Sequence, residues 1–129
     1  MDHNLTLLRL ASSLAAHSSA RQTVVTENIA HSDTPGYRAR DLPAFSDTIE
    51  APDFAIQATR PGHLDFGADA PGFAAEEIAA FGAETPNGNS VSLEDQMICA
   101  AEIRQSHDLA LGVYRKTMDI LRTSLGRQS

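Results

Sequence analysis

The chain has 129 residues, a length typical of one domain, with 42% hydrophobic residues, no tryptophan and a formal net charge of −7. This acidic balance argues against nucleic acid as a partner, because such binding relies on clustered lysine and arginine side chains that neutralise phosphates. The single cysteine excludes an internal disulfide, and no apolar run is long enough to predict a membrane-spanning helix.

A long N-terminal helix, residues 1–33, is the first predicted element. All six prolines lie between Pro35 and Pro86, and proline breaks helix interiors. Serine residues lower the helix propensity of this stretch, so we expect it to need a partner helix. Positions three or four residues apart are typical of a helix that packs along another. These positions hold Leu7, Ala11, Leu14, Ser18, Gln22, Val25 and Ile29.

The middle of the chain, residues 34–91, is predicted to be a turn followed by an extended, acidic insert rich in proline and glycine. Pro35 disfavours a helical conformation at Thr34, and Gly36 tolerates backbone angles that other residues resist. Phe54–Ile56 predicts a brief strand, and Asn87-Gly88 predicts a tight turn. We therefore expect an irregular loop or a small β-hairpin.

A second long helix is predicted over residues 92–129. Ser92 is a suitable N-cap, with Asp95 three residues later as in a capping box. The same 4-3 spacing runs through Leu93, Met97, Ala100, Arg104, His107, Leu111, Tyr114, Met118, Leu121 and Leu125. The predicted fold is therefore mainly α, with long N- and C-terminal helices pairing as a coiled coil through these stripes.

No residue pattern predicts catalysis, a metal site or a cofactor. His3, His17 and His31 are fourteen residues apart, which on a helix is about 21 Å, too far for one metal ion. Zinc-protease, nucleophile-elbow and phosphate-loop motifs are absent from the sequence. We predict that the chain is not an enzyme and binds no cofactor, and a small metalloenzyme is the alternative that elemental analysis would detect.

The segment Glu27–Leu42 resembles the signature of the flagellar basal-body rod protein family. In that family an N-terminal helix ends in Asn-(Leu/Ile)-Ala-Asn-x-x-Thr-Pro-Gly-Tyr, and here His31 replaces the second asparagine. The stretches Thr59–Leu64 and Asn89–Met97 resemble elements of the proximal-rod members. The resemblance covers nearly the whole chain and is least over residues 65–84.

This resemblance implies a structural, self-assembling subunit of the proximal rod, which links the membrane ring to the drive shaft. The implied location is the periplasmic part of the basal body, reached through the flagellar type III export apparatus without a cleaved signal peptide. Implied partners are other copies of the chain, other rod proteins, and the membrane-ring protein with its rod adaptor. Another rod subunit and a soluble helical-hairpin adaptor are the alternatives.

The predicted site residues form two sets. The assembly interface is predicted to contain Leu7, Leu14, Val25, Ile29, Leu93, Met97, His107, Leu111, Tyr114, Met118, Leu121 and Leu125. The structural turn is predicted to contain Asn28, Thr34, Pro35, Gly36 and Tyr37.

Overall fold

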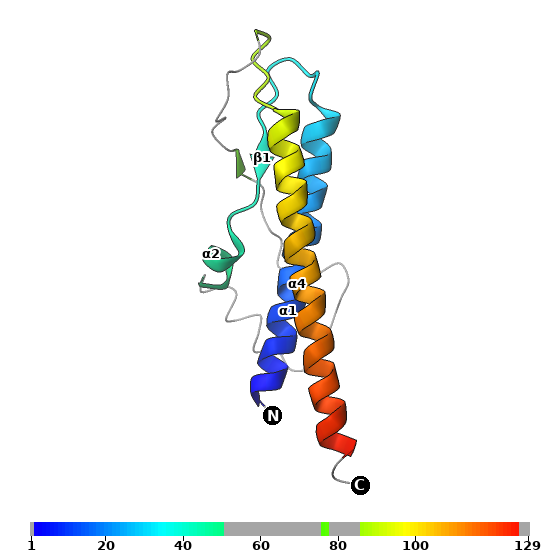
Figure 1. Ribbon diagram of the computed structural model, residues 1–129. Coiled ribbons are helices and arrows are strands. Elements are labelled where there is room, and N and C mark those ends of the chain that lie inside the picture. The colour runs from blue at the N-terminus through cyan, green and yellow to red at the C-terminus, as the bar shows by residue number, and fades with distance from the viewer. Residues whose placement is uncertain (1, 51–75, 78–85, 127–129) are drawn as a thin grey trace.

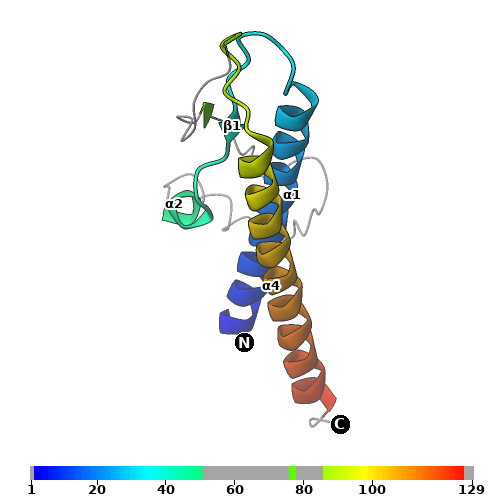
Figure 2. The same cartoon turned by 45° about the horizontal axis from the view of Figure 1, so that its top comes forward.

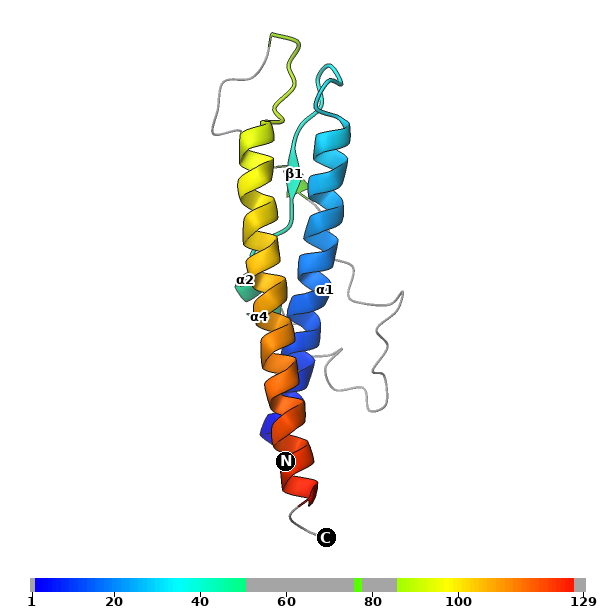
Figure 3. The same ribbon diagram turned by 45° about the vertical axis from the view of Figure 1, so that its right-hand side comes forward.

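The computed structural model of the chain describes residues 2–50, 76–77 and 86–126. Two long helices dominate it, α1 (Asp2–Ala30) and α4 (Leu93–Gly126). They lie side by side and antiparallel, so the first turn of α1 and the last turn of α4 are at the same end (Figure 1). At that end α4 extends beyond the start of α1 (Figure 3). The prediction of a mainly helical chain with long terminal helices is confirmed.

The two helices meet along a narrow seam of buried side chains that recur every seven residues. Each of these side chains is at most 5% exposed, and most are small or polar. They are Ala11, Ser18 and Val25 on α1, and Gln96, Ile103, Ala110 and Thr117 on α4. The interval suits a coiled coil, although supercoiling of the pair remains a prediction. Neither long helix, over the residues described, is apolar enough to cross a membrane.

An extended segment lies along one side of the helix pair. It contains β1 (Arg40–Asp41), which pairs antiparallel with β2 (Glu76–Glu77) and lies between α1 and α4 in Figure 3. Ala39 and Leu42 are buried there. The short helix α2 (Phe45–Glu50) follows and lies beside the helix pair (Figure 2). The segment thus adds a third layer to the half of the pair nearest the end of α1.

The element boundaries agree with the sequence at the start of α4 and differ elsewhere. Ser92 caps α4, because its hydroxyl accepts the N–H of Asp95 at 3.4 Å. α1 ends at Ala30, before the predicted boundary at residue 33. α2 lies where a loop was expected, and its first residue, Phe45, packs its ring against His17, a tertiary contact that local sequence does not reveal. Most of the predicted insert, including Phe54–Ile56, lies outside the described residues, so the β-hairpin remains a prediction.

Candidate functional site

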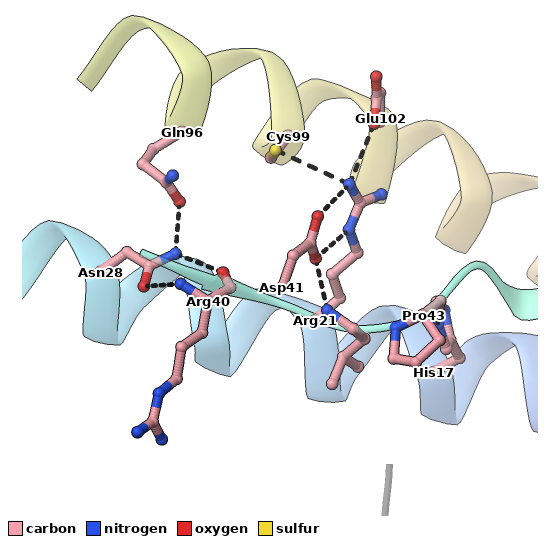
Figure 4. A network of polar contacts seen from close by, with 10 residues as sticks. His17, Arg21, Asn28, Arg40, Asp41, Pro43, Gln96, Cys99 and Glu102 are labelled. Carbon is pink, nitrogen blue, oxygen red and sulfur yellow. Dashed lines mark hydrogen bonds and ion pairs between the residues drawn. The ribbon is translucent and has the colours of Figure 1, made fainter. Parts of the chain in front are cut away.

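A buried carboxamide near the end of α1 joins the three layers of the fold. Asn28 is 0% exposed. Its Nδ2 donates to the carbonyl oxygen of Arg40 at 2.7 Å, and its Oδ1 accepts the N–H of Arg40 at 3.1 Å. Nδ2 also donates to Oε1 of Gln96 at 3.0 Å, and the hydroxyl of Tyr37 donates to Oδ1 at 3.4 Å. Asn28 therefore holds both β1 and α4 against α1 (Figure 4).

Arg21, seven residues before Asn28, forms a second connection among the same three elements. Its Nε and Nη2 donate to the two carboxylate oxygens of Asp41 at 2.8 and 3.0 Å, and Nη2 also donates to Glu102 at 3.2 Å. Its hydrogen bond to Asp41 raises the pKa of Arg21 further above its ordinary value, although partial burial acts in the opposite direction. A paired, partly buried guanidinium of this geometry stabilises more than an exposed ion pair.

His17 attaches the next part of the segment to α1. It is 6% exposed, and its Nε2 donates to the carbonyl oxygen of Pro43 at 2.8 Å, so that nitrogen carries a proton. Its ring centroid is 5.6 Å from that of Phe45, at 57°. His17 thus has a structural role, because it holds Pro43 and Phe45 against α1. Over the described ranges there is no group of three or more His, Cys, Asp or Glu side chains that could hold a metal ion.

Cys99 lies beside the guanidinium of Arg21, with Nη2 3.7 Å from Sγ. Burial raises the pKa of the Cys99 thiol, and the charge of Arg21 partly opposes this. A raised pKa lowers the fraction of thiolate, which is the form that reacts with alkylating agents.

Alkylation of Cys99 by iodoacetamide at pH 8 is therefore expected to be at least about tenfold slower in the folded chain than in the chain unfolded in urea. Both the raised pKa and the restricted access act in this direction. Mass spectrometry of timed samples measures the rate, with a free cysteine peptide in each buffer as the control. Equal rates in the two states would show that the thiol is not protected by the fold.

The turn after α1 has the backbone that the sequence predicts. The N–H of Tyr37 donates to the carbonyl of Thr34 at 3.3 Å, and Gly36 has a φ of +73°. Proline in the second position and glycine with positive φ in the third are typical of a type II turn. The ring of Tyr37 stacks on His31, with centroids 4.6 Å apart and planes at 16°. The turn therefore brings the chain back along α1.

The chain that returns from the insert is tied to this same turn. Asn89 is 1% exposed, and its Nδ2 donates to the carbonyls of His31 at 2.8 Å and Thr34 at 2.7 Å. The N–H of Gly36 donates to the carbonyl of Asn87 at 3.0 Å. The two ends of the insert are therefore held together at the end of α1. Asn89 is not among the predicted site residues, although an asparagine flanking a helix start is a recognisable signal for side-chain capping of backbone groups.

The predicted turn residues come together, whereas the predicted interface residues do not form one surface. Val25 is buried in the seam, and Leu14 is half-buried. Four others are half-buried on α4: His107, Tyr114, Met118 and Leu121. The remaining six are exposed: Leu7, Ile29, Leu93, Met97, Leu111 and Leu125. The expectation that the α4 stripe forms the seam with α1 is wrong for Leu93, Met97 and Leu111, which are exposed, whereas Gln96, Ile103, Ala110 and Thr117 are buried. The role of the stripe in contacts between subunits remains a prediction.

Comparison with known proteins identifies two relatives of the chain. A search against models of protein families finds no match. The chain is 33% identical over 112 residues to the flagellar basal body rod protein FlgB of Agrobacterium fabrum, which covers 80% of each chain. It is also 33% identical over 82 residues to FlgB of Aeromonas hydrophila, covering 60% of this chain and 61% of that relative. The chain therefore belongs to the FlgB family of flagellar basal-body rod proteins.

Proposed function

We propose that the chain is a structural subunit of the proximal rod of the flagellar basal body, where it assembles with copies of itself and with other rod proteins. The observation that carries this proposal is the reversal of the usual arrangement on α4. Its buried seam is mostly small or polar, whereas seven of its large apolar side chains are exposed. Met97, for example, is 72% exposed. A helix that is apolar on several faces is normally enclosed by neighbours.

Six of the seven exposed large apolar residues of α4 form two rows. At about 100° per residue, one row lies roughly 150° around the helix from the other, with the seam to α1 separating them on the inner side. The first row is Leu93, Met97 and Leu111, and the second is Ile98, Leu109 and Ile120. α4 therefore offers two different apolar surfaces to neighbouring subunits.

Two different surfaces on one helix favour an open assembly. When one surface of a subunit contacts a different surface of the next, the contact is heterologous, and repeated heterologous contacts that do not close produce helical filaments. Burial of such rows also stabilises the fold of each subunit, since any partner that binds only the folded chain shifts the folding equilibrium. A rod built from repeated subunits requires such repeated, non-closing contacts.

The remaining parts of the proposal concern location and partners. We place the chain in the periplasmic part of the basal body, after export through the flagellar type III apparatus without a cleaved signal peptide. Its proposed partners include the membrane-ring protein and its rod adaptor, and the proposed role is structural without catalysis. Family membership supports these assignments. A soluble helical-hairpin adaptor is the competing function, because it would also expose apolar helix faces.

Changing Leu111 to aspartate tests the proposed assembly surface. Leu111 is 37% exposed, so the isolated chain should remain folded, as measured by circular dichroism. In a strain that lacks the native protein, rods should be few or absent, because each contact loses about 1.5–3 kcal/mol of apolar burial and places a charge in the interface. Electron microscopy of isolated basal bodies provides the count.

Two control variants separate folding from assembly. Ile103→Asp places the same charge in the buried seam and should unfold the isolated chain. Gln105→Asn keeps an uncharged polar side chain at an exposed position of α4 and should leave both the fold and the rods intact. Normal rod numbers with Leu111→Asp would refute this surface, and normal rods in cells lacking the protein altogether would favour the adaptor function.

A further inference from the structure

We infer that three buried carboxamides, Asn28, Gln96 and Asn89, determine the register of α4 along α1. Asn28 and Gln96 are 0% and 2% exposed and are joined across the seam by the 3.0 Å hydrogen bond (Figure 4). Asn89 holds the chain just before α4 to the carbonyls of His31 and Thr34. All three carboxamides therefore act at one end of the helix pair, near the end of α1 and the start of α4.

The rest of the seam does not distinguish one register from another. The bond between Asn28 and Gln96 sets a register in which Leu14 faces Ala110. Moving α4 by seven residues, about 10 Å, toward the start of α1 would bring Ile103 opposite Leu14 and Cys99 opposite Ser18. Such a shift would lose little apolar contact, because small side chains replace small ones and Ile103 meets a leucine.

The carboxamides oppose this shift because they lose their partners in it. Gln96 would leave Asn28 and come opposite Arg21, whose guanidinium is already held by Asp41. Asn89 would leave the two carbonyls that it now binds. Buried amides without partners are unfavourable, and a buried polar pair in an apolar seam is a means by which helix pairs specify register. The ion pair of Arg21 with Glu102 is a weaker restraint, since the Glu102 side chain is 55% exposed.

The register matters for assembly, and this step rests on the proposed function. Exposed apolar residues come from both helices, for example Leu7 and Leu10 on α1 and Leu111 and Leu125 on α4. Their relative positions depend on how far α4 is displaced along α1. A shift of about 10 Å would alter the combined surface in every copy of the subunit. Gln96 is thus a positioning residue for assembly.

Disulfide trapping in the purified full chain tests the register directly. Cys99 is the only cysteine, so one engineered thiol gives one intramolecular disulfide. Counted from the bond between Asn28 and Gln96, Val25→Cys comes opposite Cys99 in the observed register, whereas Ser18→Cys comes opposite it only after the shift. A disulfide requires Cα atoms within about 7 Å. With native carboxamides, we expect Val25→Cys to crosslink and Ser18→Cys not to. Adding Gln96→Leu and Asn89→Ala should raise the Ser18→Cys crosslink at least about tenfold.

Matched variants make the result decisive. Thr117→Val removes a buried seam hydroxyl that donates to Val113 in its own helix, so it should leave the Ser18→Cys crosslink unchanged. If the double variant fails to fold, Gln96→Met alone, of nearly equal size, is scored instead. No increase in the Ser18→Cys crosslink while Val25→Cys still forms its disulfide would overturn the proposal.

Counts of rods in cells test separately whether the register of α4 affects assembly. Cells that express only the variant with Gln96→Leu and Asn89→Ala should form few rods. Normal rods from such a variant would refute the importance of register for assembly. The crosslinks would still decide the register itself, and Leu111→Asp would still decide the proposed assembly surface.

Discussion

Replacing Asn28 with alanine is expected to lower the free energy of unfolding by roughly 2–4 kcal/mol. The change removes the partners of both backbone groups of Arg40 and of Gln96 Oε1, and Asn28 itself is 0% exposed. Buried groups that lose their hydrogen bonds retain the full penalty of desolvation, which is larger than the net gain from a typical hydrogen bond. Urea denaturation followed by circular dichroism measures the change.

A nearby threonine provides the matched control for Asn28. Thr26→Ala removes an exposed hydroxyl that donates to Gln22 in the same helix at 2.9 Å, and it should change stability by less than about 0.5 kcal/mol. Asn28→Asp keeps the shape but replaces the Nδ2 donor with a carboxylate oxygen facing the carbonyl of Arg40, so it should destabilise at least as much as alanine. A loss below 0.5 kcal/mol for Asn28→Ala would show that the junction depends on other contacts.

The start of α4 and the turn between α1 and the insert were predictable from local chemistry, whereas α1 ends at Ala30, before the predicted boundary. Proline cannot occupy a helix interior, and a serine side chain can cap a helix start, so these signals act over a few residues. Pro35 and Gly36 likewise specify a turn without help from distant parts of the chain. α2 was missed because part of its support is distant in sequence, in the contact between Phe45 and His17.

The seam between the helices was misplaced for a physical reason. A 4-3 pattern can continue at either of two neighbouring residues, and a reading by hydrophobicity favours the less polar of the two. That preference selects Met97 over Gln96 and Leu111 over Ala110, yet Gln96 and Ala110 are the buried residues. The preference also selects Gln22 over Arg21, whose charge is neutralised by partners on other elements. Those partners lie outside α1, so the spacing of residues along α1 alone does not reveal them.

The same bias explains what the predicted stripe did identify. Large apolar residues are expected wherever a surface is to be buried, whether within one chain or between chains. In this chain the intramolecular seam uses mostly small and polar side chains, and many of the larger apolar ones are exposed. On the proposed assembly surface, hydrophobic spacing located contacts between subunits more readily than the contact within one subunit.

Gly36→Val is expected to lower the free energy of unfolding by about 1–2 kcal/mol and to reduce rod number more severely than export. Gly36 has a φ of +73°, a conformation that a β-branched residue resists. A Cβ at this position meets nothing within 4 Å, so the effect arises from the backbone rather than from a clash. The N–H of Gly36 also bonds to Asn87, so a change in φ disturbs the link between the two ends of the insert. Urea denaturation and basal-body micrographs measure the two effects.

Gly112→Val is the matched control, because it adds the same side chain at a glycine that also has open space around its Cβ. Gly112 lies within α4 and its φ is not positive, so valine there should leave stability unchanged or raise it slightly. A strain lacking the native protein and expressing Gly36→Val should export the subunit yet form few rods, since the altered turn recurs in every copy. Wild-type rod numbers, together with an unfolding free energy equal to that of Gly112→Val, would mean that the positive φ is dispensable. In that case the direction in which the chain leaves α1 would have to be set by Asn28 and Asn89 alone.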